Sequence, residues 1–146
     1  LMAIVIMHAS IRDLESVLYL EKVCFEEDAW TILDLTYALS APNKIRFKAL
    51  VDENFAGFAA AENHTKECIS WITTIAVLPE YRNRGVASAL LDACEADLSY
   101  PKVRLAVNVH NIAAIRLYRK YGYKEIETWK NYYMNGDNAL IMEKQL

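Results

Sequence analysis

The sequence predicts a mixed α/β fold of one domain around a single sheet. Short runs of apolar and β-branched residues, suited to strands, alternate with longer stretches whose apolar residues recur at the spacing of a helix packed on a sheet. Turn-forming residues separate these runs. The 146 residues, of which 54% are hydrophobic, suffice for one compact domain, residues 1–146, with a sizeable core.

We expect the elements in the order β-α-α-β-β-β-α-β-α-β-β. The run Leu1–Met7 is apolar but too short to span a membrane. We therefore expect it to form the first strand. Ser10, followed three residues later by Asp13, indicates a helix start with a weaker form of the capping box, and a first helix of about 12 to 14 residues should follow. A second, short helix is expected over Thr31–Leu39, ended by Pro42.

The middle of the chain predicts three strands and a helix. Ile45–Val51 and Phe55–Ala61 are β-suited runs joined by turn residues 52–54, so they are expected to form a hairpin. Ile69–Leu78 is expected to be a third, central strand. From Val86 onwards the apolar residues return at helical spacing and define one face of a helix: Leu90, Cys94 and Leu98.

The last third of the chain predicts a strand, a helix and two further strands. Val103–Val109 has the pattern of a buried strand. Asn111 opens a helix over Ala113–Tyr121, and Gly122 closes it as a left-handed cap. Two final strands are expected around a turn at residues 135–137: Tyr123–Trp129 and Ala139–Lys144.

The composition argues against several classes of protein. The net charge is −3 and the basic residues are dispersed, which gives little support for a nucleic-acid surface. Three widely spaced cysteines, without a CxxC pair or a histidine cluster, favour reduced thiols in a cytoplasmic protein and no metal site. No apolar run is long enough to cross a bilayer. Neither G-x-x-x-x-G-K-[ST] nor G-x-G-x-x-G is present, so a nucleoside triphosphatase or dinucleotide oxidoreductase is not expected.

The segment between the third central strand and the next helix has the properties of a phosphate-binding loop. The strand breaks at Pro79, and Arg82–Ala87 leads into the helix. The first turn of a helix presents unpaired backbone N–H groups and partial positive charge to an anion. Gly85 allows a tight turn and close approach of the anion to the backbone. The alternative is a solvated turn that only connects two elements.

Two motifs resemble those of the GNAT superfamily of N-acetyltransferases. The spacing Arg-x-x-Gly-x-Ala over residues 82–87 is similar to its pyrophosphate signature. Residues 108–123 are similar to a second signature, N-x-x-A-x-x-L-Y-x-x-x-G-F, whose positions are filled by Asn111, Ala114, Leu117, Tyr118, Gly122 and Tyr123. The resemblance implies one GNAT-like domain, a mixed and mostly antiparallel sheet with about four helices, and acetyl-CoA as co-substrate.

The resemblance also implies roles for individual residues. Tyr118 would give a proton or a hydrogen bond to the departing thiolate. The strand that includes Ile75, Ala76 and Val77 would bind the pantetheine arm and form an oxyanion hole through its backbone, although the Ile75 and Val77 side chains fit a core role. The coenzyme-binding set is Ile75, Ala76, Val77, Arg82, Asn83, Arg84, Gly85, Val86, Ala87, Asn111 and Tyr118.

The C-terminal part resembles the subfamily that acetylates protein N-terminal α-amines, including the ribosomal-protein-alanine type. By this resemblance Tyr132 and Tyr133 line the peptide groove, and Phe25 and Trp30 belong to its other wall. Glu26 stands where that subfamily usually has proline, so the match is weaker there. The alternatives are an aromatic pair on a sheet edge for the tyrosines and a core position for Phe25 or Trp30, which is favoured for Trp30.

The general base stays open in the sequence. Related enzymes often have Glu or His at the position of Ala106, and some use the position of Trp71, but neither residue here accepts a proton. Deprotonation would then use an ordered water or one of the carboxylates at residues 26–28, which also fit a solvated turn. His110 is expected to cap the next helix or to face solvent.

We therefore expect an acetyl-CoA-dependent N-acetyltransferase that acts on a protein or peptide N-terminal α-amine by direct attack in a ternary complex. A ribosome or an auxiliary subunit is a further partner that the resemblance allows. A small-molecule amine acetyltransferase, acting on polyamines or amino sugars, is one alternative. A catalytically weak acyl-CoA-binding regulatory module is the other, because Ala106 and Trp71 leave no evident base.

Overall fold

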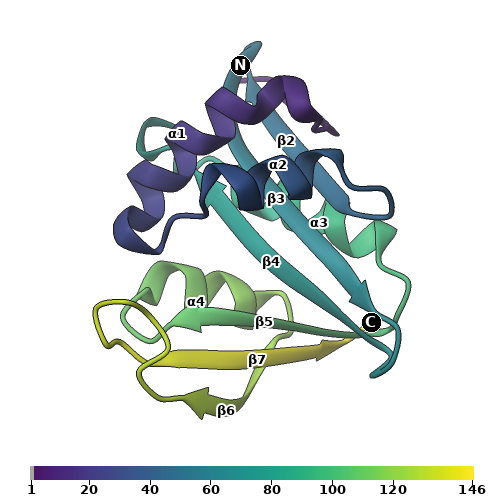
Figure 1. Cartoon of the computed structure of the whole chain (residues 1–146), viewed down its shortest axis with the longest axis vertical. Coiled ribbons are helices and arrows are strands. Elements are labelled where there is room, and N and C mark those ends of the chain that lie inside the picture. Colours follow the sequence, from purple (N-terminus) through teal and green to yellow (C-terminus); the bar gives the residue numbers. More distant parts are fainter. Residues whose placement is uncertain (1) are drawn as a thin grey trace. The chain divides into compact units, whose positions relative to one another are not determined.

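The computed structural model describes residues 2–146 and contains seven strands and four α-helices within them (Figure 1). Three short 3-10 helices precede α1, α2 and α3: η1 (Ile11–Asp13), η2 (Glu26–Asp28) and η3 (Pro79–Tyr81). The other elements, in chain order, are β1 (Ile4–His8), α1 (Leu14–Phe25), α2 (Ile32–Ser40), β2 (Ile45–Val51), β3 (Asn54–His64), β4 (Ile69–Val77), α3 (Val86–Asp97), β5 (Lys102–Asn108), α4 (Ile112–Lys120), β6 (Lys124–Trp129) and β7 (Ala139–Gln145).

The strands form one sheet in the order β1-β2-β3-β4-β5-β7-β6. The ladders β1–β2, β2–β3, β5–β7 and β6–β7 are antiparallel, whereas β4 and β5 are parallel. The mixed, mostly antiparallel sheet and the order of elements confirm the predicted fold class. The first predicted strand begins later than expected, at Ile4, and Leu1 lies outside the described residues.

Local sequence signals account for the two N-terminal helices. Ser10 accepts a hydrogen bond from the backbone of Arg12, while Asp13 accepts one from the Ser10 N–H at 2.9 Å, so the capping box is complete. The helix begins there with a 3-10 turn before α1. Thr31 and Asp34 form a second capping box at the start of α2. These caps satisfy backbone donors that each helix start leaves unpaired.

Contacts divide the chain into two compact units, residues 1–62 with 74–98 and residues 63–73 with 99–146. In the first unit, α1 and α2 cross one face of β3 and β4, and α3 lies behind these strands (Figure 1). The core cluster on the α1 and α2 side joins side chains from both helices to those of β3 and β4, and its members include Val17, Leu20, Leu35, Leu39, Phe58 and Ala76. The apolar spacing of the two helices therefore buries their sheet-facing sides.

Gly57 on β3 lies close to the backbone of β4 and to a side chain of α3. A Cβ at this position would meet the Ala76 carbonyl oxygen at 2.7 Å and Leu90 Cδ1 at 3.2 Å. Real Cβ atoms do not approach backbone oxygen this closely, so β4 or α3 would have to move. Only glycine fits between the two elements.

We expect Gly57→Ala to lower the free energy of unfolding by about 1–3 kcal/mol, the usual cost of an overpacked core. Where space is available, the same substitution in other proteins stabilises the fold by about 0.4–1 kcal/mol through the unfolded chain, so the sign of the change is diagnostic. Urea unfolding of both proteins measures it. An unchanged or higher midpoint would mean that β4 yields without cost.

In the second unit, α4 and the strands β5, β6 and β7 form the main body. The burial of β5 alternates, with Val103, Leu105 and Val107 buried and the residues between them partly exposed. Met142 of β7 pairs with Leu105 and is fully buried. Alternation therefore places Arg104, Ala106 and Asn108 on the opposite face of the sheet.

Among residues 2–146, every helix is too short or too polar to cross a bilayer. Cys24, Cys68 and Cys94 are free thiols. Burial raises the pKa of Cys94 to about 12, so this thiol stays protonated near neutral pH. Within the described part of the chain, no three His, Cys, Asp or Glu side chains gather as metal ligands do.

Candidate functional site

The first unit contains the predicted phosphate-binding loop. The chain leaves β4 through η3 and reaches Gly85, which adopts a left-handed φ of 85° as the N-cap of α3. A Cβ on Gly85 would meet nothing within 4 Å, and the residue is exposed. Gly85 makes no side-chain cap to α3. The first turn of α3 therefore receives no hydrogen bond from its N-cap side chain, and uncapped N–H groups at a helix start are the arrangement that binds anions.

Arg82 connects this loop to the end of β4. Its Nε donates to the Val77 carbonyl at 3.0 Å, and its Nη2 lies 3.4 Å from Cys24 Sγ. Cys24 also donates to the Val77 carbonyl at 3.5 Å. Burial raises the pKa of the Cys24 thiol, and the Arg82 contact opposes this shift. The sequence did not predict the contact, because the two residues are 58 positions apart.

Arg84 lies in the same exposed loop but has different neighbours. Its guanidinium is 6.0 Å from the centre of the Tyr81 ring, within the range of a cation–π contact. Asn83, between the two arginines, has a positive φ of 61°. The two positive charges of the loop are therefore held by different contacts: a hydrogen bond to Val77 for Arg82, and the Tyr81 ring for Arg84.

The predicted pantetheine strand is the last part of β4. Ala76 and Val77 are buried and Ile75 is partly exposed, so the expectation of core packing is met for the Val77 side chain. The parallel ladder to β5 covers Ser70 and Trp71. Residues 74–77 lie beyond this ladder. Their backbone role stays a prediction.

Glu21 on α1 is a residue that the sequence reasoning missed. Its side chain is fully buried and accepts hydrogen bonds from Thr74 Oγ1 at 3.0 Å and from the Trp30 backbone N–H at 3.4 Å. Burial raises the pKa of this carboxyl, and the two hydrogen bonds act in the opposite direction. The signal was present in the sequence, because Glu21 follows Val17 by one helical turn on the apolar face of α1.

We expect Glu21→Gln to stabilise the fold at pH 7, because burial disfavours the charged form of the carboxyl and glutamine carries no charge. A carboxyl whose folded pKa is raised contributes stability below its unfolded pKa, near 4.5, and loses it as pH rises through the folded pKa. The advantage of the glutamine should therefore shrink as pH falls from 8 towards 4.5. Urea unfolding across this range measures it, and an advantage that grows at low pH would contradict the assignment.

The predicted groove residue Phe25 is the last residue of α1, and Trp30 lies between α1 and α2. Phe25 and Trp30 are partly buried and pack against the core cluster of the first unit. The packing of Trp30 against this cluster supports the alternative that it is a core residue. The acidic residues form η2, with Glu26 and Glu27 exposed, which agrees with their solvated-turn alternative.

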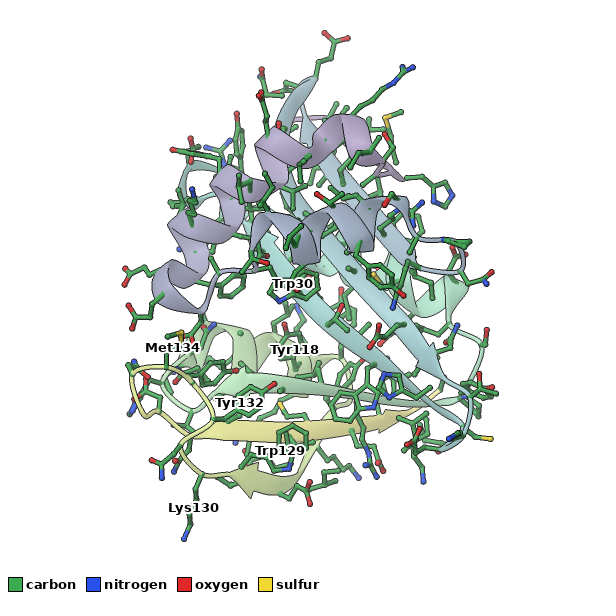
Figure 2. All side chains as sticks on the ribbon, viewed as in Figure 1. Trp30, Tyr118, Trp129, Lys130, Tyr132 and Met134 are labelled. Atoms are coloured by element: carbon green, nitrogen blue, oxygen red, sulfur yellow. The ribbon has the colours of Figure 1, made fainter. Side chains whose placement is uncertain are left out.

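The second unit holds Tyr118, the predicted catalytic residue, and Asn111, a predicted coenzyme contact. Asn111 caps α4 by accepting a hydrogen bond from the Ala114 N–H at 3.2 Å. Tyr118 lies on this helix, is only 7% exposed, and meets the Tyr123 ring edge-on at 5.9 Å between ring centres. Figure 2 shows the Tyr118 side chain within the second unit. The Tyr118 ring is thus buried against a second ring, and its role at the thioester sulfur stays a prediction.

Tyr132 and Tyr133 lie in the loop between β6 and β7, which we call the tyrosine loop (residues 130–138). Both backbone N–H groups donate to the Asp137 carbonyl at 3.1 Å, and the two rings meet edge-on at 5.0 Å. Tyr132 is 53% exposed. The predicted peptide contacts therefore sit in a hydrogen-bonded hairpin loop, not on a strand edge.

Asp137 holds the tyrosine loop against the end of β5. Its Oδ2 accepts hydrogen bonds from Asn108 at 3.0 Å and from Asn135 at 2.9 Å, and these bonds lower the pKa of the carboxyl. His110 Nε2 lies 3.6 Å from Asp137 Oδ1, and the His110 side chain is 75% exposed. Asn111 provides the helix cap, so His110 faces solvent, one of the two expected outcomes.

Residues 9–123 match the family model "Acetyltransferase (GNAT) family". The chain belongs to this family. It is 32% identical to the N-alpha-acetyltransferase of Saccharolobus solfataricus over 114 residues, 68% of each chain. Three further curated relatives are matched over 47–49% of their own length.

Solved structures of GNAT enzymes have the same fold. The ribosomal-protein-S18-alanine N-acetyltransferase from Escherichia coli has a TM-score of 0.84 at 25% identity, covering 98% of this chain and 94% of that one. Arabidopsis thaliana NAA60 in complex with acetyl-CoA has a TM-score of 0.86 at 18% identity, covering 99% of each chain. The protein is therefore an acetyltransferase of the GNAT family, and it has the GNAT fold.

Proposed function

We propose that this GNAT enzyme acetylates the N-terminal α-amine of proteins or peptides. The tyrosine loop carries the proposal, because it presents the exposed ring of Tyr132 on a backbone fixed by Asp137. Similarity to an N-alpha-acetyltransferase supports the same substrate class. Phe25, Tyr132 and Tyr133 are proposed to contact the peptide.

The coenzyme is proposed to bind through backbone groups. Its pyrophosphate would accept hydrogen bonds from the first turn of α3, beside Arg82 and Arg84, with the remaining contacts at Asn83, Gly85, Val86 and Ala87. The backbone of residues 75–77 would hold the pantetheine arm and polarise the thioester oxygen. Asn111 and Tyr118 are assigned to the sulfur end.

The chemistry then needs little help from a strong base. An α-amine has a pKa of about 8, so a sizeable fraction is neutral near neutral pH. The neutral nitrogen attacks the thioester carbon, a C–N bond forms and the C–S bond breaks. The nitrogen gives up its surplus proton to water, and the thiolate takes one from the Tyr118 hydroxyl, which water then restores.

A cytoplasmic location and a protein partner belong to the same proposal. Three free thiols suit a reducing compartment. A GNAT chain of the NatC complex has the same fold, with a TM-score of 0.83 at 20% identity, which motivates a search for an auxiliary subunit or a ribosome contact.

The test is acetylation of a mixed peptide library with acetyl-CoA, read by mass spectrometry, with polyamines and peptides carrying only ε-amines as competitors. We expect acetyl groups on α-amines. Acetylation of the small amines alone would overturn the proposal in favour of a metabolite enzyme. Tight acetyl-CoA binding without any transfer would instead favour a binding module.

A further inference from the structure

Five rings of the second unit contact one another in an unbroken series, which we call the aromatic row. It runs from His64 on β3 through Trp71 on β4 and Trp129 on β6 to Tyr132 and Tyr133 in the tyrosine loop. Successive ring centres are 6.1, 6.0, 5.4 and 5.0 Å apart. These separations are those of direct aromatic contact.

The sheet register explains why the two tryptophans meet. Trp71 pairs with Arg104, and Ala106 and Ile141 are the next pair on that face of β5 and β7. Two strands separate β4 from β6, a lateral span of about 14 Å, so the rings must reach across the sheet. They can do so because Ala106 has only a methyl group.

Burial on this face supports the same picture. Ile141 is fully buried, although its pair partner Ala106 is too small to cover it. Trp129 pairs with Ala139 and follows Glu127, the partner of Ile141, along β6. Trp71 and Trp129 thus meet on the face of the sheet to which Ala106 and Ile141 belong.

Charges around the aromatic row are already engaged. Glu127 accepts a hydrogen bond from Trp129 Nε1 at 2.7 Å, and Glu143 pairs with Arg104 at 2.7 Å. Asp137 is held by two asparagine side chains. The Lys130 side chain points away from Trp129 and Tyr132 (Figure 2). A cationic ligand would therefore compete with existing partners for each carboxylate.

The row continues into an apolar, exposed end. Tyr132 is 53% exposed and Met134 is 77% exposed, while Trp71 and Trp129 each keep part of their surface accessible. Tyrosine and tryptophan side chains that combine an apolar ring with a polar group are enriched at binding interfaces. It is continuous with the tyrosine loop, to which the proposed function assigns the peptide.

We propose that the aromatic row binds the side chain of the substrate's first residue and selects large apolar residues, such as methionine, leucine or phenylalanine, over small or charged ones. The inference rests on the proposed function. Packing on the rings removes apolar surface from water, and each additional buried methylene should raise kcat/KM about threefold to fourfold. A small first residue leaves the rings exposed to water, so its peptide does not gain this increase in kcat/KM.

The test measures kcat/KM for peptides that differ only in their first residue: methionine, leucine, phenylalanine, alanine, serine and lysine. The wild-type protein should favour the first three over the last three by tenfold or more. Trp129→Ala should reduce kcat/KM for the large residues at least tenfold while changing that for alanine and serine less than threefold, and Trp129→Phe should restore most of the loss.

Two further variants keep the test decisive. Tyr132→Ala removes an exposed ring and should narrow the preference even if Trp129→Ala does not fold. Tyr19→Ala removes another exposed tyrosine ring, on α1, and should leave the preference unchanged. A wild-type preference for alanine, serine or lysine, or an equal loss for every peptide in both row variants, would overturn the inference. If no α-amine is acetylated at all, the proposed function itself fails.

Discussion

Tyr118→Phe is expected to lower the turnover number about 10²- to 10⁴-fold, the usual contribution of one positioned acid–base group. Affinity for acetyl-CoA should change less than about threefold, because the lost hydroxyl acts on the departing thiolate in the transition state. The ring itself stays, so its contact with Tyr123 and its burial are retained. The effect should therefore appear in kcat and not in stability.

Steady-state kinetics and calorimetric acetyl-CoA titration check this expectation. Tyr121→Phe is the matched control, since it removes a hydroxyl from the C-cap residue of the same helix. The control should keep turnover within about threefold of wild type, because the Tyr121 hydroxyl takes no part in the proposed chemistry. Equal losses in turnover and in coenzyme affinity for Tyr118→Phe would remove the residue from the role of proton donor.

Ala87→Glu is expected to have opposite effects on the fold and on coenzyme binding. A carboxylate in the first turn of α3 interacts favourably with the helix dipole, by about 0.3–1 kcal/mol, so thermal stability should hold or rise. The same charge would repel a pyrophosphate bound there, and affinity for acetyl-CoA should fall by about tenfold or more, the scale of one unfavourable charge contact near a protein surface.

The neutral variant Ala87→Gln separates charge from size. It should lose much less affinity than Ala87→Glu, and added salt should narrow the difference, because screening weakens the repulsion. Calorimetric titration at two salt concentrations, with thermal unfolding alongside, measures both quantities. Equal affinities for the two variants would place the pyrophosphate away from the α3 terminus.

Most of the fold was accessible from the sequence because its signals are local. Ile45–Val51 was predicted with the bounds that β2 has, and the glycine closing α4 adopts the left-handed φ of 96° expected of a cap. The deviations are at the ends of elements. One example is the 3-10 turn that precedes α1, where hydrogen bonding varies without a clear change in residue type.

The candidate site was less accessible, because its missing parts are contacts between distant residues. The link from Cys24 to Arg82, the bond from Thr74 to Glu21 and the contact of Trp71 with Trp129 each join residues more than 50 positions apart. The last contact also depends on β7 lying between β5 and β6, an order that no local pattern encodes. Sequence motifs therefore predicted the loops themselves, whereas the residues that contact these loops became known only from the structure.

The central claim is that the acetyl group goes to an α-amine. The most direct measurement uses one peptide that carries both a free α-amine and a lysine ε-amine, together with the same peptide blocked at its N-terminus, and locates the acetyl group by fragmentation in the mass spectrometer. We expect the label on the α-amine of the free peptide and no label on the blocked one. Labelling of the lysine in both peptides would contradict the account.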